Sequence, residues 1–258
     1  MAGTERIYGW HAVRAVLERG ADRVVAVYIG EQREDPRAKA VLDLASRVGQ
    51  PVKRVPVAQL TQWFGEVAHQ GVCAEVRPLD PWGEDRLLAA LGAAQAAPQS
   101  ALQGGPPIVL VLDGVQDPHN LGACLRTADA CGALAVVVPR DRASQLNATV
   151  RKVAAGAAET TPVVAVTNLA RSLALMKDAG LWVIGADAAG PKLAQDTDLT
   201  GPVALVMGAE GSGLRQLTRQ TCDLLVRLPQ SGAVESLNVS VAAGMLLYEA
   251  TRQRVGAG

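Results

Sequence analysis

"ALVMGAEGSGL", residues 204–214, joins a short apolar run to a loop that holds three glycines in six residues and one carboxylate, Glu210. A continuous apolar run of this length, ended by glycine, is typical of a buried strand in a parallel sheet. Ligands bind at the carboxyl ends of strands in such sheets, so the loop is expected to line a ligand site.

The glycines of this loop run G-x-x-G-x-G, and no GK[ST] follows them. The order disfavours a dinucleotide-binding turn and the missing lysine disfavours a phosphate loop. Glu210 would repel an anionic ligand, so it suits a cationic or hydroxyl-rich ligand, or a nearby arginine. A tight turn with a solvated glutamate is the alternative.

The same alternation of apolar runs and amphipathic segments extends over residues 108–254. It predicts an α/β fold with a mostly parallel sheet covered on both faces. A final helix is expected from about Asn238 to Arg254. The predicted strands are 108–113, 134–139, 161–166, 181–187, 202–207 and 224–228.

Residues 7–76 form a second, smaller α/β pattern. Helices are expected over 11–20 and 37–49, each ending at a glycine, with strands over 24–29, 52–55 and 71–76. Residues 78–107 are rich in Pro, Gly, Ala and Gln and are read as a linker with one short helix near 84–91. We therefore expect domains over 1–77 and 108–258, joined by that linker.

Composition narrows the class of protein. The chain has 258 residues, a formal net charge of zero, and 49% hydrophobic but only 3% aromatic residues, so its core is expected to be aliphatic. Neither a membrane span nor a secretory signal is expected, which favours a cytoplasmic protein. The four cysteines show no C-x-x-C pairing and are read as buried hydrophobes rather than as disulfide or zinc residues, so no metal is expected.

The loop after the 108–113 strand reads DGVQDPHNLGACLRTADACG, 113–132. Asp117 followed by Pro118 predicts the start of a helix, and Gly132 its end. Arg126 lies off the centre of the apolar stripe and could be a surface residue paired with Asp129, and Asn120 could be only a cap. His119 near an aspartate suggests a hydrolase triad, but no nucleophile elbow accompanies it.

The loop after the 224–228 strand reads LPQSGAVESLNVSVAAG, 228–244. Ser236 and Asn238 flank the start of the last helix, and either could simply cap it. That helix is apolar on more than one face, which indicates burial on two sides and a subunit interface.

These three loops, in this order and at strand ends, resemble motifs one, two and three of the SpoU/TrmH family of RNA ribose 2′-O-methyltransferases. Further stretches, including 7–20 and 141–159, are similar to the bacterial members that methylate a guanosine of 23S rRNA. The resemblance covers nearly the whole chain except 78–107. Glu235 departs from relatives that carry a small residue there, which affects RNA fit or cap geometry more than chemistry.

The resemblance implies an N-terminal L30e-like RNA-binding domain, a C-terminal SPOUT-class domain with a deep trefoil knot, and a homodimer that acts on 23S rRNA. It also implies S-adenosyl-L-methionine as cofactor, held by Gly208, Leu228 and Leu237. The catalytic positions that it implies are Asn120, Arg126, Glu210, Ser236 and Asn238.

The implied reaction is an in-line attack of a ribose 2′-hydroxyl on the sulfonium methyl. Family proposals make Arg126 the base, but a guanidinium stays protonated in proteins. We hypothesise instead that Arg126 binds the RNA phosphate and ribose and lowers the pKa of the hydroxyl, while phosphate or water takes the proton. Glu210 would orient Arg126 or hold the ribose, and Asn120, Ser236 and Asn238 would fix the network.

Three other functions stay open at this stage. A tRNA ribose methyltransferase of the same family is the nearest, followed by a non-catalytic RNA-binding protein on the same scaffold. A nicotinamide dehydrogenase is disfavoured by the glycine order. The sequence identifies neither the modified nucleotide nor whether free rRNA or an assembling subunit is the substrate.

Overall fold

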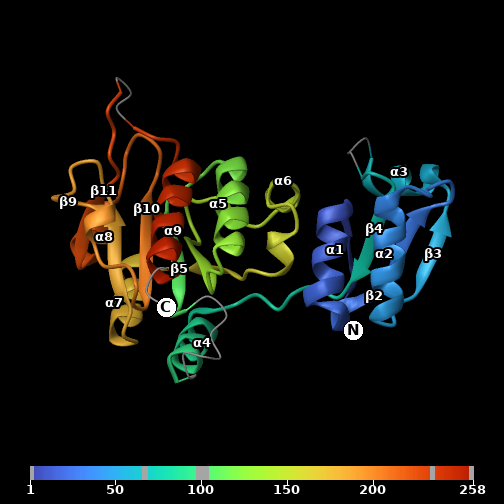
Figure 1. The fold of residues 1–258 in the computed structure, drawn as a ribbon, viewed down its shortest axis with the longest axis horizontal. Helices are drawn as coiled ribbons and strands as arrows, with labels where there is room; N and C mark the ends of the chain where they lie inside the picture. The colour runs from blue at the N-terminus through green and yellow to red at the C-terminus, as the bar shows by residue number, and fades with distance from the viewer. Residues whose placement is uncertain (1–2, 66–68, 97–104, 233–235, 256–258) are drawn as a thin grey trace. The chain divides into compact units, whose positions relative to one another are not determined.

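The computed structural model describes residues 3–65, 69–96, 105–232 and 236–255, and these form two units. The first holds residues 1–80 and 155–160, and the second holds 81–154 and 161–258. Figure 1 shows the elements of each unit. Glu235 and the Pro/Gln-rich part of the expected linker lie outside the described residues.

The first unit has a four-stranded sheet in the order β1-β4-β2-β3. The pairs β1–β4 and β4–β2 are antiparallel, and β2–β3 is parallel. Its strands are β1 (Glu5–Tyr8), β2 (Val24–Gly30), β3 (Val52–Val55) and β4 (Val72–Val76), and its helices are α1 (Trp10–Arg19), α2 (Pro36–Arg47) and α3 (Val57–Phe64). A short 3₁₀ turn, Ala157–Glu159, belongs to the same unit.

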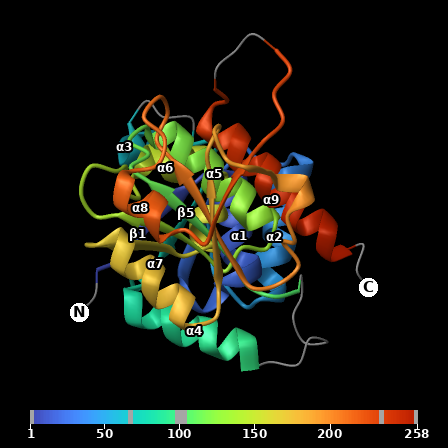
Figure 2. The same cartoon turned by 90° about the vertical axis from the view of Figure 1, so that its left-hand side faces the viewer.

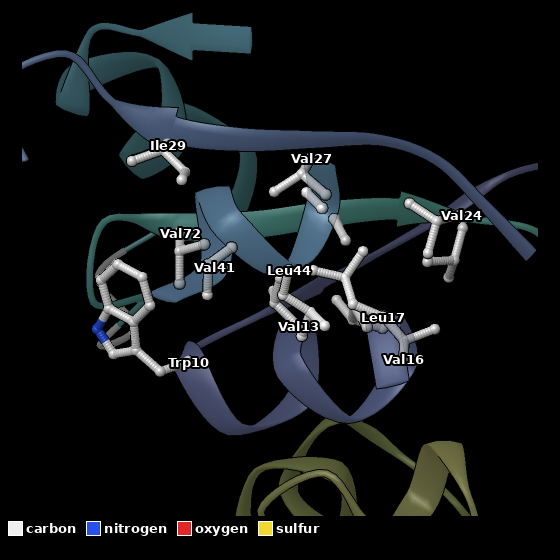
Figure 3. Close-up of a cluster of buried hydrophobic side chains, with 14 of the residues drawn as sticks. Trp10, Val13, Val16, Leu17, Val24, Val27, Ile29, Val41, Leu44 and Val72 are labelled. Carbon is white, nitrogen blue, oxygen red and sulfur yellow. The ribbon is translucent and has the colours of Figure 1, made fainter. Parts of the chain in front are cut away.

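The main core of this unit lies between one face of the sheet and helices α1 and α2. Figure 3 shows Val27 and Val72 from the strands pointing toward Val13 of α1 and Val41 and Leu44 of α2. These side chains are buried because alternate strand residues point to one face, while helical residues three and four apart share a stripe. The opposite sheet face carries a smaller cluster under α3.

The second unit is built on a seven-stranded sheet in the order β7-β6-β5-β10-β8-β11-β9, and every described pair in it is parallel. The α/β fold with a mostly parallel sheet is therefore confirmed. The strands are β5 (Ile108–Asp113), β6 (Ala135–Pro139), β7 (Val163–Val166), β8 (Trp182–Ala186), β9 (Lys192–Leu193), β10 (Val203–Gly208) and β11 (Leu224–Arg227).

Helices cover both faces of this sheet. The helices α4 and α7 pack on one face with α8 beside α7, and α5 and α9 pack against each other on the other face (Figure 2). The bounds are α4 (Glu84–Ala96), α5 (Pro118–Ala130), α6 (Ala148–Val153), α7 (Leu169–Asp178), α8 (Gln216–Thr221) and α9 (Val239–Val255). Continuous apolar strands are stable here because neither face meets water.

Helix α4 differs from the expected short helix within a linker. It runs to Ala96 instead of about residue 91. Leu87 and Leu91 are buried in the core together with side chains of α7 and β7. Leucines four residues apart give the helix one apolar stripe, and burying that stripe attaches the segment to the second unit.

All four cysteines lie in described segments and are free thiols. Burial raises the pKa of Cys73, Cys124 and Cys222 to about 12. No group of three or more His, Cys, Asp or Glu side chains that could hold a metal occurs among the described residues. No described helix is long and apolar enough to cross a membrane.

Candidate active site

The strand-end loop that contains Glu210 folds back on itself at once after β10. Ala209 N donates to Gly213 O at 3.1 Å, and Gly213 N donates to Ala209 O at 2.9 Å. Gly211 and Gly213 have φ values of 78° and 65°, a left-handed conformation that favours glycine. The pair of backbone hydrogen bonds therefore fixes a five-residue loop with exposed Glu210 near its tip.

Gly208 is required for a different reason. A Cβ on Gly208 would lie 2.1 Å from the carbonyl carbon of Gly213 and 2.4 Å from the nitrogen of Leu214. The returning backbone thus occupies the space of a side chain. This close approach lets main-chain groups of the loop form one wall of a cavity.

That cavity has a volume of about 480 Å³ and lies at the carboxyl ends of three adjacent strands, β10, β8 and β11. Its lining is mostly small and apolar, with three charged side chains. The residues that line it include Ala186, Asp187, Met207, Gly208, Ala209, Glu210, Gly211, Ser212, Gly213, Arg219, Val226, Leu228, Ser236, Leu237 and Ala242. The volume is within the range of small-molecule sites.

A second cavity of about 300 Å³ adjoins the first at the carboxyl ends of β5 and β10. It shares Ala209, Glu210, Ser212 and Val239 with the first cavity and adds residues of the loop after β5. Those additions are Gly114, Val115, Gln116, Asp117 and Asn120. Glu210 therefore stands at the boundary of the two cavities.

Helix α5 begins as expected, because the Asp117 side chain accepts a hydrogen bond from His119 N at 2.9 Å and Pro118 is the first helical residue. The cap is Asp117, so the alternative reading of Asn120 as only a cap is wrong. Asn120 instead accepts a hydrogen bond from Asn238 Nδ2 at 3.0 Å. This bond joins the first and third motif loops.

Asn238 also caps α9, since its Oδ1 accepts hydrogen bonds from Ser240 N at 2.9 Å and Ser240 Oγ at 2.6 Å. The Asn238 side chain thus caps α9 with its oxygen and donates to Asn120 with its nitrogen. The capping and network interpretations of Asn238 are compatible.

Six of the expected site residues line the cavities directly: Gly208, Glu210, Leu228, Ser236 and Leu237 the first, and Asn120 the second. Asn238 joins them through Asn120. Arg126 lies on an exposed turn of α5 and does not line either cavity. In one chain the structure therefore brings together all the expected positions except Arg126.

Two aspartates at strand ends support the site, and the sequence pattern did not single them out for this. Asp113 is buried at the end of β5; its Oδ2 accepts from Arg215 N at 2.9 Å and its Oδ1 lies 3.5 Å from Arg215 Nε. This pair ties the loop after β10 to β5. Asp187 directly follows β8, lines the first cavity and pairs with Arg219 at 2.9 Å. The strand-end rule applied to β8 would have found Asp187.

Comparison with known proteins places these features in a family. A family model described as the SpoU rRNA Methylase family matches residues 107–248, and another described as RNA 2'-O ribose methyltransferase substrate binding matches residues 6–82.

Individual relatives agree with the family models. The chain is 51% identical over 254 residues to the 23S rRNA (guanosine-2'-O-)-methyltransferase RlmB of Pseudomonas aeruginosa, covering 98% of both, and 50% identical over 254 residues to the protein of the same name from Pseudomonas putida, again covering 98% of both. The solved SpoU methyltransferase AviRb from Streptomyces viridochromogenes, in complex with the cofactor AdoMet, has a TM-score of 0.71 and 26% identity, covering 98% of this chain and 91% of that one.

Proposed function

The chain belongs to the SpoU rRNA methylase family, and from that membership and its two adjoining cavities we propose that it methylates the ribose 2′-hydroxyl of a guanosine in 23S rRNA with S-adenosylmethionine as donor. The observation that carries the proposal is the convergence of three strand-end loops, around Asn120, Glu210 and Ser236, on one pair of cavities. Relatives about half identical over 98% of the chain, each named as a 23S rRNA guanosine methyltransferase, support the substrate.

The first cavity suits the donor. Glycine at position 208 lets the returning backbone pack close to β10, which places main-chain groups of the loop in the cavity wall. The Leu228 and Leu237 side chains offer an apolar slot for a flat ring. Glu210 places a negative charge beside a ligand that carries a sulfonium and two ribose hydroxyls, and Asp187, although paired with Arg219, adds carboxylate oxygens that can accept from those hydroxyls. When bound, S-adenosylmethionine supplies an activated methyl group, so the protein has chiefly to align the acceptor.

The second cavity suits the acceptor ribose, because it adjoins the first at Glu210. Glu210 can accept a hydrogen bond from a ribose hydroxyl or hold a guanidinium. The Asn120–Asn238 hydrogen bond fixes the two loops that flank this boundary, and Ser236 adds a hydroxyl on the side of the third loop. These groups orient the nucleotide, and none of them has to change its charge.

Arg126 completes the site in this proposal by binding the RNA phosphate and ribose and favouring the ionised 2′-hydroxyl, while phosphate or water accepts the proton. A guanidinium serves for that because it stays charged and presents several donors. Since Arg126 does not line either cavity in one chain, we propose that the functional form is a homodimer in which Arg126 serves a site shared by two copies.

An apolar stripe on α9 supports the homodimer. Val241, Met245 and Tyr248 are 52%, 39% and 65% exposed, and their spacing places them on one side of the helix. Neighbouring α5, which carries Arg126, packs against α9. A second copy seated on this stripe would lie beside the turn that carries Arg126.

We also propose that the second unit contains the deep trefoil knot and works in the cytoplasm, where rRNA is available. Membership of the SpoU family supports the knot. We propose RNA binding for residues 1–77 and methyl transfer for residues 108–258. The described part of the 78–107 segment supplies α4 to the core of the second unit and so does more than link.

The test is methyl transfer from labelled S-adenosylmethionine to unmodified 23S rRNA, with tRNA in parallel. Arg126→Ala should lower the rate by about 10²–10³-fold, the usual cost of losing one positioned charge donor, and should leave donor affinity within about twofold. Glu210→Gln should cost less if it only orients. Arg171→Ala, which removes an exposed arginine on α7, is the control for lost charge.

The outcomes separate the parts of the proposal. Activity that survives Arg126→Ala would remove the assigned role of Arg126. Methylation of tRNA but not of 23S rRNA would identify the chain as a tRNA ribose methyltransferase of the same family. RNA binding without any methyl transfer would leave a non-catalytic RNA-binding protein.

A further inference from the structure

One face of the sheet in the first unit gathers half of the Trp, Tyr and Phe side chains of the protein. The sequence holds four Trp, three Tyr and one Phe. Four of these eight, Tyr8, Tyr28, Trp63 and Phe64, lie in the small cluster on the face opposite α1 and α2. These rings pack α3 against this face, whereas the larger core of the unit lies on the other face and is mostly aliphatic.

The rings pack in two pairs around the end of α3. Tyr28 and Trp63 meet edge to face with centroids 5.0 Å apart, and Tyr8 and Phe64 have centroids 4.8 Å apart. These contacts hold the rings in fixed orientations. Trp63, Tyr8 and Phe64 remain partly exposed.

Two exposed cations lie on the same face, one on each edge strand. The guanidinium carbon of Arg6, on β1, is 3.9 Å from the centroid of the Trp63 ring. Nζ of Lys53, on β3, is 5.7 Å from the centroid of the Tyr28 ring. Strand register explains the second contact, since Tyr28 pairs with Lys53.

A single carboxylate stands between the cations. Glu75 on β4 pairs with Arg6 in register and accepts hydrogen bonds from Thr4 Oγ1 at 2.6 Å and Tyr28 Oη at 2.9 Å. Its oxygens are therefore engaged within the sheet face. The outward groups of this surface are the Arg6 guanidinium, the Lys53 ammonium and the partly exposed rings.

We propose that this surface, made of Arg6, Tyr8, Lys53, Trp63 and Phe64 over the buried Tyr28, binds single-stranded or looped RNA, with a base stacked on the Arg6–Trp63 pair and a phosphate on Lys53. Unpaired bases in RNA stack on aromatic rings and on arginine planes, and cations flanking such platforms track the backbone. An apolar protein partner would not require cations on both edge strands. The proposal deepens the proposed function and rests on it for the identity of the RNA.

Arg6 is the central residue in this arrangement. Its guanidinium carbon already lies 3.9 Å from the centroid of the Trp63 ring and the side chain is exposed, so a base can add as a third layer. Exposed cation–π pairs stabilise a protein only weakly, so removal of Arg6 should leave the fold intact and change RNA binding.

The experiment measures binding of the full chain to a fluorescein-labelled 12-nucleotide single-stranded RNA and the KM for unmodified 23S rRNA. Arg6→Ala should weaken binding by about tenfold, within the range for losing one stacked base. Arg6→Lys keeps the charge but loses the flat surface, so it should also weaken binding severalfold. Lys53→Ala should lower the slope of log affinity against log salt by about one.

Lys39→Ala is the matched control, because Lys39 is an exposed cation of the same unit on α2, across the sheet. It should leave binding within twofold, and all variants should keep the wild-type melting temperature and kcat at saturating RNA. Wild-type affinity in Arg6→Ala, or equal losses in Arg6→Ala and Lys39→Ala, would overturn the proposal. If the wild type binds RNA in this way but methylates no rRNA, the proposed function fails and this surface stands.

Discussion

Replacing Gly208 with alanine tests whether the returning backbone forms the wall of the donor cavity. The added Cβ would lie 2.1 Å from Gly213 C, 2.4 Å from Leu214 N and 2.5 Å from Gly213 O. Ordinary carbon contacts are 3.5–4.0 Å, so the two backbone segments must separate by about 1 Å or more. All three atoms are backbone, so no side-chain rotation relieves the overlap.

The separation would break the two hydrogen bonds between Ala209 and Gly213. At about 1 kcal/mol net for each, about 2 kcal/mol of loop stability is lost, which corresponds to about thirtyfold in an equilibrium constant. We therefore expect Gly208→Ala to bind S-adenosylmethionine about thirtyfold more weakly. Isothermal titration calorimetry measures this directly.

The matched control is Gly201→Ala, because Gly201 lies just before β10 and a Cβ there would meet nothing within 4 Å. It should bind the donor within twofold of wild type. Urea unfolding of both variants separates loss of the loop from loss of the fold. Wild-type affinity in a folded Gly208→Ala protein would refute the argument that this loop builds the cavity.

Three further perturbations test other parts of the structure. Burial raises the thiol pKa of Cys73, Cys124 and Cys222 from 9 to about 12. The unfolded chain therefore loses these protons at lower pH than the folded chain, and the free energy of unfolding should fall as pH rises from 9 toward 12. The urea midpoint should be lower at about pH 10.5 than at about pH 8, and Cys73→Ala should reduce that difference. Tyr248→Glu on the exposed stripe of α9 should shift the homodimer to monomer in sedimentation while donor binding persists, and an unchanged dimer would place the interface elsewhere. Leu91→Ala should lower the free energy of unfolding by about 2–5 kcal/mol. In the control, Gly92→Ala at the exposed neighbouring residue should raise the free energy of unfolding by about 1 kcal/mol. A small effect of Leu91→Ala would mean that α4 is not part of the core.

Local chemistry was enough to predict most of the second unit. Apolar runs located six of the strands of the parallel sheet, and Asp117, Pro118 and Gly132 marked the limits of α5. These features depend on a few neighbouring residues, which a sequence displays directly. The predictions for residues 11–20 and 37–49 succeeded for the same reason.

The elements that were missed are short or lack a clear pattern. Strand β1 has four residues with charges at two of them, β9 has two residues, and α3 has eight beside Pro56. Their stability comes from pairing or packing with distant segments, such as Arg6 opposite Glu75. Local pattern carries little information about contacts of that kind.

The site shows the same division. Parallel strands direct attention to strand ends, but the order β5-β10-β8-β11 decides which ends are neighbours, and it is a property of the whole sheet. For that reason the convergence of three loops came from family resemblance, and Asp187 was overlooked although it ends a predicted strand.

The position of Glu210 follows from restraints at both ends of its loop. The Ala209–Gly213 hydrogen bonds close the loop, and the Asp113–Arg215 pair attaches Arg215, two residues after the loop, to β5. Neither restraint uses the Glu210 side chain, so its carboxylate stays free to meet a ligand at the boundary of the two cavities. A sulfonium in the first cavity favours a negative charge at this boundary. A ribose hydroxyl or a guanidinium in the second cavity favours it as well. One carboxylate fixed by its backbone can therefore serve both cavities, and the glycines of the loop are the means by which the backbone fixes it.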